Sequence, residues 1–233
     1  WHVIEAADGN YRDFRAGQIL LDLLERRLAT PDTSAAPEVP DTAVPPMPGP
    51  QPTLLEHVDL GQHLDRDAYR ERLGAAQQRL YRLAWELHRE RRHVVGVFEG
   101  WDAAGKGGAI RRLTRAMDAR LYRTIPVRAP TDEEHAHHWL WRFWRHLPMR
   151  GYLVLYDRSW YGRVLVERVE ELAARHEWQR AYSEINDFEE QLVAHGTVLV
   201  KFWLHVSPEE QLERFRSREA TPWKMYKITD EDW

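Results

Sequence analysis

Apolar residues follow two different spacings along this chain. Four short runs are almost continuously apolar and rich in β-branched residues, and stretches with helical spacing separate them. Strands of this kind that alternate with helices are typical of a parallel sheet covered on both faces. The predicted strands are residues 93–99, 123–127, 152–157 and 197–206. The pattern therefore predicts a three-layer α/β/α fold, with ligands at the carboxyl ends of the strands.

Two elements precede a proline-rich segment. Residues 2–6 read as a strand, and apolar residues then recur at helical spacing as far as Leu28. Residues 30–53 hold most of the thirteen prolines, which favours an extended linker over a helix or a central strand. A lone strand and helix cannot bury a core. Residues 1–29 therefore either dock on the later elements of the chain or form the tail of a preceding domain.

Two further stretches are predicted as helices. A long amphipathic helix is expected over residues 66–92, with Asp65 as its N-cap. The stretch from His135 to His146 is rich in histidine, but it lacks the ligand spacing of a metal site. We predict a surface helix there instead. Its buried residues are expected to be Trp139, Leu140, Phe143 and Trp144.

A glycine-rich loop follows the first apolar run. Gly100, Gly105 and Lys106 have the spacing G-x-x-x-x-G-K between a predicted strand and a predicted helix. Such a P-loop wraps an anion with backbone amides at a helix N-terminus, and its lysine reaches the phosphates. A glycine-rich turn with a solvated lysine is the plainer alternative. The predicted phosphate-binding loop residues are Gly100, Ala103, Ala104, Gly105, Lys106, Gly107 and Gly108.

The position after the P-loop lysine is unusual. Nucleoside triphosphatases carry a Ser or Thr there whose hydroxyl binds Mg²⁺, whereas this chain has Gly107. Asp102 is the candidate replacement, because a carboxylate among phosphate-binding amides is repelled unless a cation bridges it to the phosphates. The alternative is that Asp102 caps amides of its own loop. The sequence thus predicts a Mg²⁺ site that uses Asp102.

A second candidate metal ligand lies at the end of the third apolar run. Asp157 stands where a Walker B acid holds Mg²⁺, although an Asp at a strand end can also cap a helix. Arg158 is expected to face phosphate. Arg163 is either a phosphate ligand or the i,i+4 partner of Glu167.

The carboxyl-terminal part is basic. Ser207 and Pro208 have the residue types of an N-cap and first helical position. The segment after them suits a basic helical lid that closes over phosphates and excludes water. Arg218, Lys224 and Lys227 are the candidate lid residues, and exposed basic side chains without a function are the alternative.

Composition excludes several classes of protein. The 233 residues carry a net charge of -4, whereas general nucleic-acid binders usually have a basic excess, so no nucleic-acid partner is expected. No apolar run approaches the roughly 20 residues of a membrane span. The absence of Cys excludes disulfides and fits a cytoplasmic location. Homo-oligomer formation is compatible with these observations.

Several segments together resemble the polyphosphate kinase 2 family. FEGWDAAGKGGAIRRLT is similar to its Walker A segment, YDRSWYGRVLVERV to its Walker B segment, and RFRSREATPWKMYKITDED to the start of its lid. PTDEEHAHHWLWRFWRHLPMRG, residues 130–151, resembles the segment between the two Walker motifs. The likeness covers about residues 65–233 and implies a P-loop kinase-like fold.

Within that family, the chain most resembles members with two fused kinase domains that act on AMP. WHVIEAADGNYR resembles the end of a first domain, which implies that residues 1–29 are its tail. Residues 54–233 then form the second domain, truncated within the lid. The resemblance implies Mg²⁺-dependent transfer from inorganic polyphosphate to AMP, giving ADP. It also implies roles for Asp102 and Asp157 with the metal, for Lys106 and Arg158 with phosphate, for Glu167 as the acid after Walker B, and for Arg218 in the lid.

Two other functions stay open on the residues alone. An ATP-dependent nucleoside monophosphate kinase is disfavoured by Gly107 and by the D-R-S-W-Y motif. A P-loop module that binds nucleotide or polyphosphate without turnover is disfavoured by the presence of Lys106, Asp102 and Asp157 and favoured by the expected truncation of the lid.

Overall fold

A single parallel sheet organises the chain in the computed structural model, which describes residues 1–29 and 53–223. The five strands are β1 (His2–Glu5), β2 (Val94–Gly100), β3 (Tyr122–Pro126), β4 (Leu153–Asp157) and β5 (Val198–His205). They lie in the order β1-β5-β2-β4-β3, and every neighbouring pair is parallel. All carboxyl ends therefore meet at one edge of the sheet.

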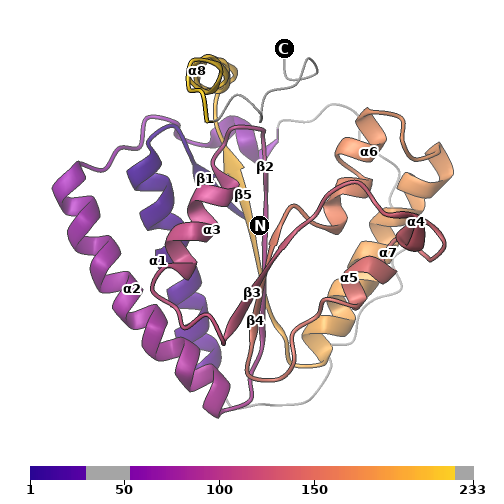
Figure 1. Ribbon diagram of the computed structural model, residues 1–233, viewed down its shortest axis with the longest axis horizontal. Helices are drawn as coiled ribbons and strands as arrows, with labels where there is room; N and C mark the ends of the chain where they lie inside the picture. Colours follow the sequence, from indigo (N-terminus) through magenta and orange to yellow (C-terminus); the bar gives the residue numbers. More distant parts are fainter. Residues whose placement is uncertain (30–52, 224–233) are drawn as a thin grey trace.

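Helices cover both faces of this sheet (Figure 1). One layer holds α1 (Gly9–Ala29), α2 (Arg66–Arg89) and α3 (Lys106–Thr114). The other holds α4 (Asp132–His135), α5 (Trp141–Trp144), α6 (Val166–Val169) and α7 (Arg175–Ala194). Two short 3-10 helices, η1 (Leu54–His57) and η2 (Trp160–Arg163), lie in connections, and α8 (Pro208–Glu219) lies beyond the carboxyl ends of the strands. The three-layer α/β/α fold is confirmed.

Alternating side chains of the central strand serve two separate cores. Val94 and Phe98 join the apolar cluster beneath α1, α2 and α3. Val95 and Val97 join the cluster beneath α5 and α7. Because successive strand residues point to opposite faces, a strand buried on both sides must be apolar throughout. This explains the continuous apolar run at β2.

The amino-terminal elements dock on the rest of the chain. β1 extends the sheet by pairing with β5, with Ile4 opposite Leu204. α1 packs against α2 and α3, and its Leu20 and Leu24 are fully buried. Burying each such side chain contributes about 1.5–3 kcal/mol. Of the two arrangements considered for residues 1–29, the structure has the docked one, and their origin in a preceding domain stays a prediction.

The predicted helix boundaries are partly correct. The Asp65 carboxylate accepts from the amides of Asp67 and Ala68, so it caps α2 as expected. Ser207 likewise caps α8 by accepting from the Glu210 amide. The expected extension of the first of these helices to residue 92 is wrong. It ends at Arg89, because Arg91 adopts a left-handed conformation with φ of 56° that closes the last turn.

Two predictions about burial and one about a helix are wrong. The apolar run at β3 forms an edge strand, paired only with β4, and its side chains are half-buried or exposed. The predicted single helix over residues 135–146 is interrupted, since α4 and α5 are separate one-turn helices. Trp139 and Trp144 were both expected inside, but Trp139 is half-buried and 42% of Trp144 is exposed, whereas Leu140 and Phe143 are buried. Within residues 1–29 and 53–223, no helix has the length and apolarity to cross a bilayer.

Candidate active site

The P-loop connects the end of β2 to the start of α3 and needs glycine at two positions. Gly100 and Gly105 have φ values of 134° and 103°, a region that residues with a Cβ rarely adopt. A Cβ on Gly100 would overlap the backbone of Leu204 in β5, and one on Gly105 would overlap the Arg12 guanidinium. Both predicted glycines are therefore required by the turn and by close neighbours.

Lys106 is held inside the loop. Its Nζ donates to the carbonyls of Gly100 at 2.7 Å and Trp101 at 3.1 Å, and it lies 3.8 Å from Asp102 Oδ1. Burial lowers the pKa of Lys106, and the Asp102 carboxylate opposes that shift. The lysine is consequently fixed before any phosphate arrives.

The ends of β2 and β4 bring an acid and a base together. The Arg158 guanidinium donates to Asp102 Oδ1 at 2.8 Å, and both side chains are half exposed. The Arg158 amide also donates to the Phe98 carbonyl, which fixes the turn after β4 against β2. Asp102 therefore contacts two cations, and no hydrogen bond from the described loop amides to its carboxylate is found. The loop-capping interpretation is therefore not supported, and binding of Mg²⁺ by Asp102 stays a prediction.

Asp157 lies beside the start of α3. A Cβ placed on Gly107 would come 3.4 Å from Asp157 Oδ2, which is the short limit of an ordinary van der Waals contact. The Asp157 charge also acts on the pKa of Lys106. The helix-cap role considered for Asp157 is filled by Ser159, whose Oγ accepts from the Tyr161 amide at the start of η2. The Asp157 carboxylate thus borders the position where P-loop nucleoside triphosphatases have a hydroxyl.

The donor set here fits Mg²⁺ only together with a phosphate ligand. In the part of the chain that the structure describes, no three His, Asp or Glu side chains gather closely enough to hold a metal alone. Mg²⁺ is commonly bound through one or two carboxylates, with substrate phosphates and water as the other ligands. Asp157, in the space beside Gly107, and Asp102 match that pattern in type and number.

The outer surface of the P-loop is held by two arginines that the sequence did not identify as site residues. Arg214 in α8 donates to the carbonyls of Ala103 at 3.0 Å, Ala104 at 3.2 Å and Ala7 at 2.9 Å. Arg12 in α1 donates to the Ala104 carbonyl at 3.3 Å. Ala103 is left-handed, with φ of 60°, and Ala104 is fully buried. Because the carbonyls are bound from outside, the loop is held in one conformation.

Glu99 is a further group that the sequence analysis missed. This buried carboxylate accepts from Ser159 Oγ at 2.8 Å, which links the end of β2 to the turn after β4. Burial raises the pKa of Glu99, and the hydrogen bond from Ser159 and the charge of Lys106 oppose the shift. One sequence signal could have identified this contact. An acid directly precedes the P-loop glycine, and a Ser follows two residues after the Walker B acid.

The remaining candidates lie apart from this cluster or outside the described residues. Arg163 Nη1 pairs with Glu167 at 3.0 Å, and its guanidinium lies over the Trp139 ring. The i,i+4 pairing is thereby confirmed, and the geometry gives no support to a phosphate contact by Arg163. Arg218 is half-buried in the last turn of α8. Gly108 lies next to the Arg12 guanidinium, and Lys224 and Lys227 lie beyond the last described residue.

Comparison with known proteins shows which family has these motifs. The family model of polyphosphate kinase 2 matches residues 63–233. This chain belongs to the polyphosphate kinase 2 family. A family member from Pseudomonas aeruginosa, named polyphosphate:AMP phosphotransferase, is 52% identical over all of this chain and 47% of its own length. One of the same name from Pseudomonas syringae is 48% identical over all of this chain and 46% of its own length.

A solved structure of a family member is also similar to this chain. The polyphosphate kinase 2 from Pseudomonas aeruginosa PA01 superimposes with a TM-score of 0.74 and 52% identity, over all of this chain and 47% of that one. The chain thus spans about half the length of these three proteins.

Proposed function

We propose that this chain transfers a phosphoryl group from inorganic polyphosphate to AMP in the cytoplasm, giving ADP and a polyphosphate one unit shorter. Support comes from the two relatives named polyphosphate:AMP phosphotransferase, which match the chain from end to end. The observation that carries the proposal is the Asp157 carboxylate beside Gly107, where ATP-dependent P-loop enzymes place a metal-binding hydroxyl.

The reaction needs little proton transfer from the protein. An α-phosphate oxygen of AMP attacks the terminal phosphorus of polyphosphate, a new P–O–P bond forms, and the old terminal P–O–P bond breaks. The attacking oxygen is already anionic at neutral pH, so no strong general base is required. Positioning and charge stabilisation are therefore the main tasks of the site.

The site residues divide those tasks between them. The P-loop amides and the Lys106 ammonium bind the phosphates, since both direct positive charge into the loop. Arg158 stabilises charge that develops on the transferred group, and Asp102 holds that guanidinium in place. Asp102 and Asp157 are proposed to bind Mg²⁺, which when bound neutralises the phosphate oxygens.

The lid and Glu167 have supporting roles in this proposal. Arg218, Lys224 and Lys227 are proposed to cover the phosphates from the carboxyl-terminal side, which excludes water as a competing acceptor. Glu167 holds the Arg163 side chain in place, because the two side chains form an ion pair. We therefore assign Arg163 a structural role and not a phosphate contact.

A donor comparison tests the proposal. The purified protein is incubated with AMP and Mg²⁺, and either polyphosphate or ATP is added, while ADP is measured. In the ATP arm the AMP carries a label, so that only ADP made from AMP is counted. We expect ADP with polyphosphate and much less with ATP. Formation of ADP with ATP but not with polyphosphate would contradict the assigned donor. Absence of ADP with either donor would indicate a phosphate-binding module without turnover.

A further inference from the structure

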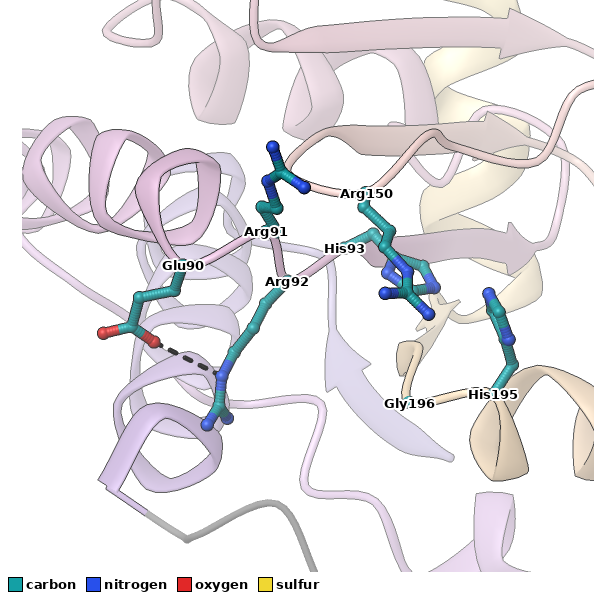
Figure 2. Close-up of a pocket in the computed structure, with 7 residues that line it drawn as sticks. All are labelled: Glu90, Arg91, Arg92, His93, Arg150, His195 and Gly196. Atoms are coloured by element: carbon teal, nitrogen blue, oxygen red, sulfur yellow. Dashed lines mark ion pairs between the residues drawn. The ribbon is translucent and has the colours of Figure 1, made fainter. Parts of the chain in front are cut away.

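A second concentration of positive charge lies at the opposite edge of the sheet from the P-loop. The segments that enter β2, β4 and β5 enclose a pocket of about 470 Å³ (Figure 2). Parallel strands place these amino ends as far from the P-loop as the sheet allows. Basic and imidazole side chains that line the pocket are Arg91, Arg92, His93, Arg150 and His195.

The sheet itself fixes the position of these segments. The Gly151 amide donates to the Arg92 carbonyl at 2.9 Å, which ties the turn before β4 to the start of β2. The Val198 amide donates to the His93 carbonyl at 3.0 Å, which does the same for β5. The pocket is therefore built from three strand entrances that hydrogen bonds hold side by side.

Most of the positive charge in the pocket has no acidic partner. Glu90 pairs with Arg92 at 3.3 Å and points away from the other side chains (Figure 2). Among the residues that the structure describes, no acid pairs with Arg91, Arg150 or His195. Figure 2 shows Arg150, His93 and His195 directed toward one another. Three groups that can carry positive charge thus converge without a counter-charge.

His93 lines this pocket and has an unsatisfied polar atom. The side chain is buried, with 5% of the residue exposed, and its Nδ1 has no hydrogen-bond partner within the described residues. The His93 and His195 ring centroids are 5.3 Å apart. Burial lowers the pKa of His93, and the charges of His195 and Arg150 lower it further. A buried nitrogen without a hydrogen bond destabilises the folded state, and a ligand oxygen would remove that penalty.

Helix ends explain only part of this arrangement. Basic side chains near the carboxyl ends of α2 and α7 interact favourably with the last carbonyls of those helices. That accounts for Arg91 and His195. It does not account for Arg150, which lies in the turn before β4 and raises the electrostatic cost of protonating His93.

We propose that this pocket binds a phosphate oxyanion between Arg150, His93 and His195. The planar guanidinium can donate two parallel hydrogen bonds to one phosphate group. His93 Nδ1 supplies a third donor in the tautomer that carries the proton there, and His195 supplies a ring nitrogen at the rim. The same chemistry suits free phosphate and a segment of polyphosphate chain. The inference stands on the pocket alone and does not require the proposed transferase activity.

The test follows the imidazole signals of His93 and His195 by nuclear magnetic resonance at constant ionic strength and pH. Inorganic phosphate is titrated in one arm and polyphosphate in the other, with chloride as the reference salt. The proposal predicts saturable shifts of both rings. Saturation by both ligands, tighter with polyphosphate, would identify the chain as a ligand, and saturation by inorganic phosphate alone would identify the free ion.

Matched variants separate the pocket from general attraction to charge. Arg150→Gln should weaken phosphate binding by about tenfold to a hundredfold, because it removes charge-assisted hydrogen bonds. Arg82→Gln removes the same charge from an exposed position on α2 and should leave the titration unchanged. His195→Ala, also at an exposed position, should weaken the shift of His93. Absent or non-saturating shifts, or equal weakening by Arg150→Gln and Arg82→Gln, would overturn the proposal.

Discussion

The two edges of the sheet carry positive charge in contrasting ways. At the carboxyl edge, Lys106, Arg158 and Arg214 each have partners: loop carbonyls, the Asp102 carboxylate and further carbonyls. At the amino edge, Arg150 converges on two histidines and no acid in the described residues pairs with it. The first edge is arranged before substrate binds. At the second edge, Arg150 and His195 are exposed to solvent and stay open to a ligand.

This difference shows what preorganisation requires. A site for chemistry must fix its charged groups within a small tolerance, because misplacing them by an ångström lowers the rate strongly. Internal partners such as Asp102 supply that precision. A site that only binds an anion can leave its cations unpaired, since the ligand orders them. Substitutions at single positions test the contrast, beginning with the largest expected effect.

Asp102→Asn removes the carboxylate that joins Lys106 and Arg158 and is proposed to bind the metal. We expect the rate of ADP formation from polyphosphate and AMP to fall by about a thousandfold, as for loss of a main electrostatic group. The melting temperature should change little, because Asp102 is exposed to solvent. Retained activity would mean that the metal is organised elsewhere.

Arg214→Ala tests the outer support of the P-loop. Without the guanidinium the Ala103 carbonyl loses its donor and the Ala104 carbonyl keeps only Arg12, so the loop should be held less firmly. A tenfold to hundredfold lower kcat/KM is expected, roughly the effect of losing one or two charged hydrogen bonds. Arg216→Ala, at an exposed position on the same helix, is the control. Equal effects of the two changes would show that α8 contributes only charge.

Gly107→Ser and Gly107→Ala test the space beside Asp157. Either substitution adds a Cβ 3.4 Å from Asp157 Oδ2, so both should lower the rate by about the same amount, roughly tenfold. The measurement is the rate of ADP formation by each variant as the Mg²⁺ concentration is raised. Should the serine variant bind Mg²⁺ as tightly as the parent while the alanine variant does not, its hydroxyl would be replacing Asp157.

The smallest effect concerns Glu99 and pH. Its folded-state pKa is raised above the ordinary value of 4.5, so the native protein retains a proton that the unfolded chain releases. Stability from this group is therefore present at pH below 4.5 and is lost as pH rises through the raised pKa.

Glu99→Gln removes that titration and keeps an acceptor for Ser159. The melting temperature of the variant, relative to the parent, should rise by roughly 2–4 °C between pH 5 and pH 8. The exposed Glu213→Gln serves as the control. A difference independent of pH would contradict the assigned shift.

The sequence predicted the parts of the fold and site that depend on local patterns. Buried parallel strands need continuous apolar runs, which located β2, β4 and β5. The P-loop needs glycine at left-handed positions, which located Gly100 and Gly105. Helix caps depend on nearby residues, so Asp65 and Ser207 were recognised correctly.

Contacts between distant segments were not predictable in the same way. Arg12 and Arg214 contact the P-loop from α1 and α8, and no residue spacing in the sequence predicts these contacts. The exposed side chains of β3 follow from its place at the sheet edge, which strand propensity does not reveal. Trp144 was misplaced because a one-turn helix has no continuous apolar stripe to orient it.

The central claim is that phosphoryl transfer takes place at the P-loop edge, with polyphosphate as donor. Its most direct test is transfer of radioactive phosphate from labelled polyphosphate to AMP, in the presence of Mg²⁺, by the parent protein and by Lys106→Ala. The account predicts labelled ADP with the parent and almost none with the variant. Equal labelling of ADP by both proteins would contradict it.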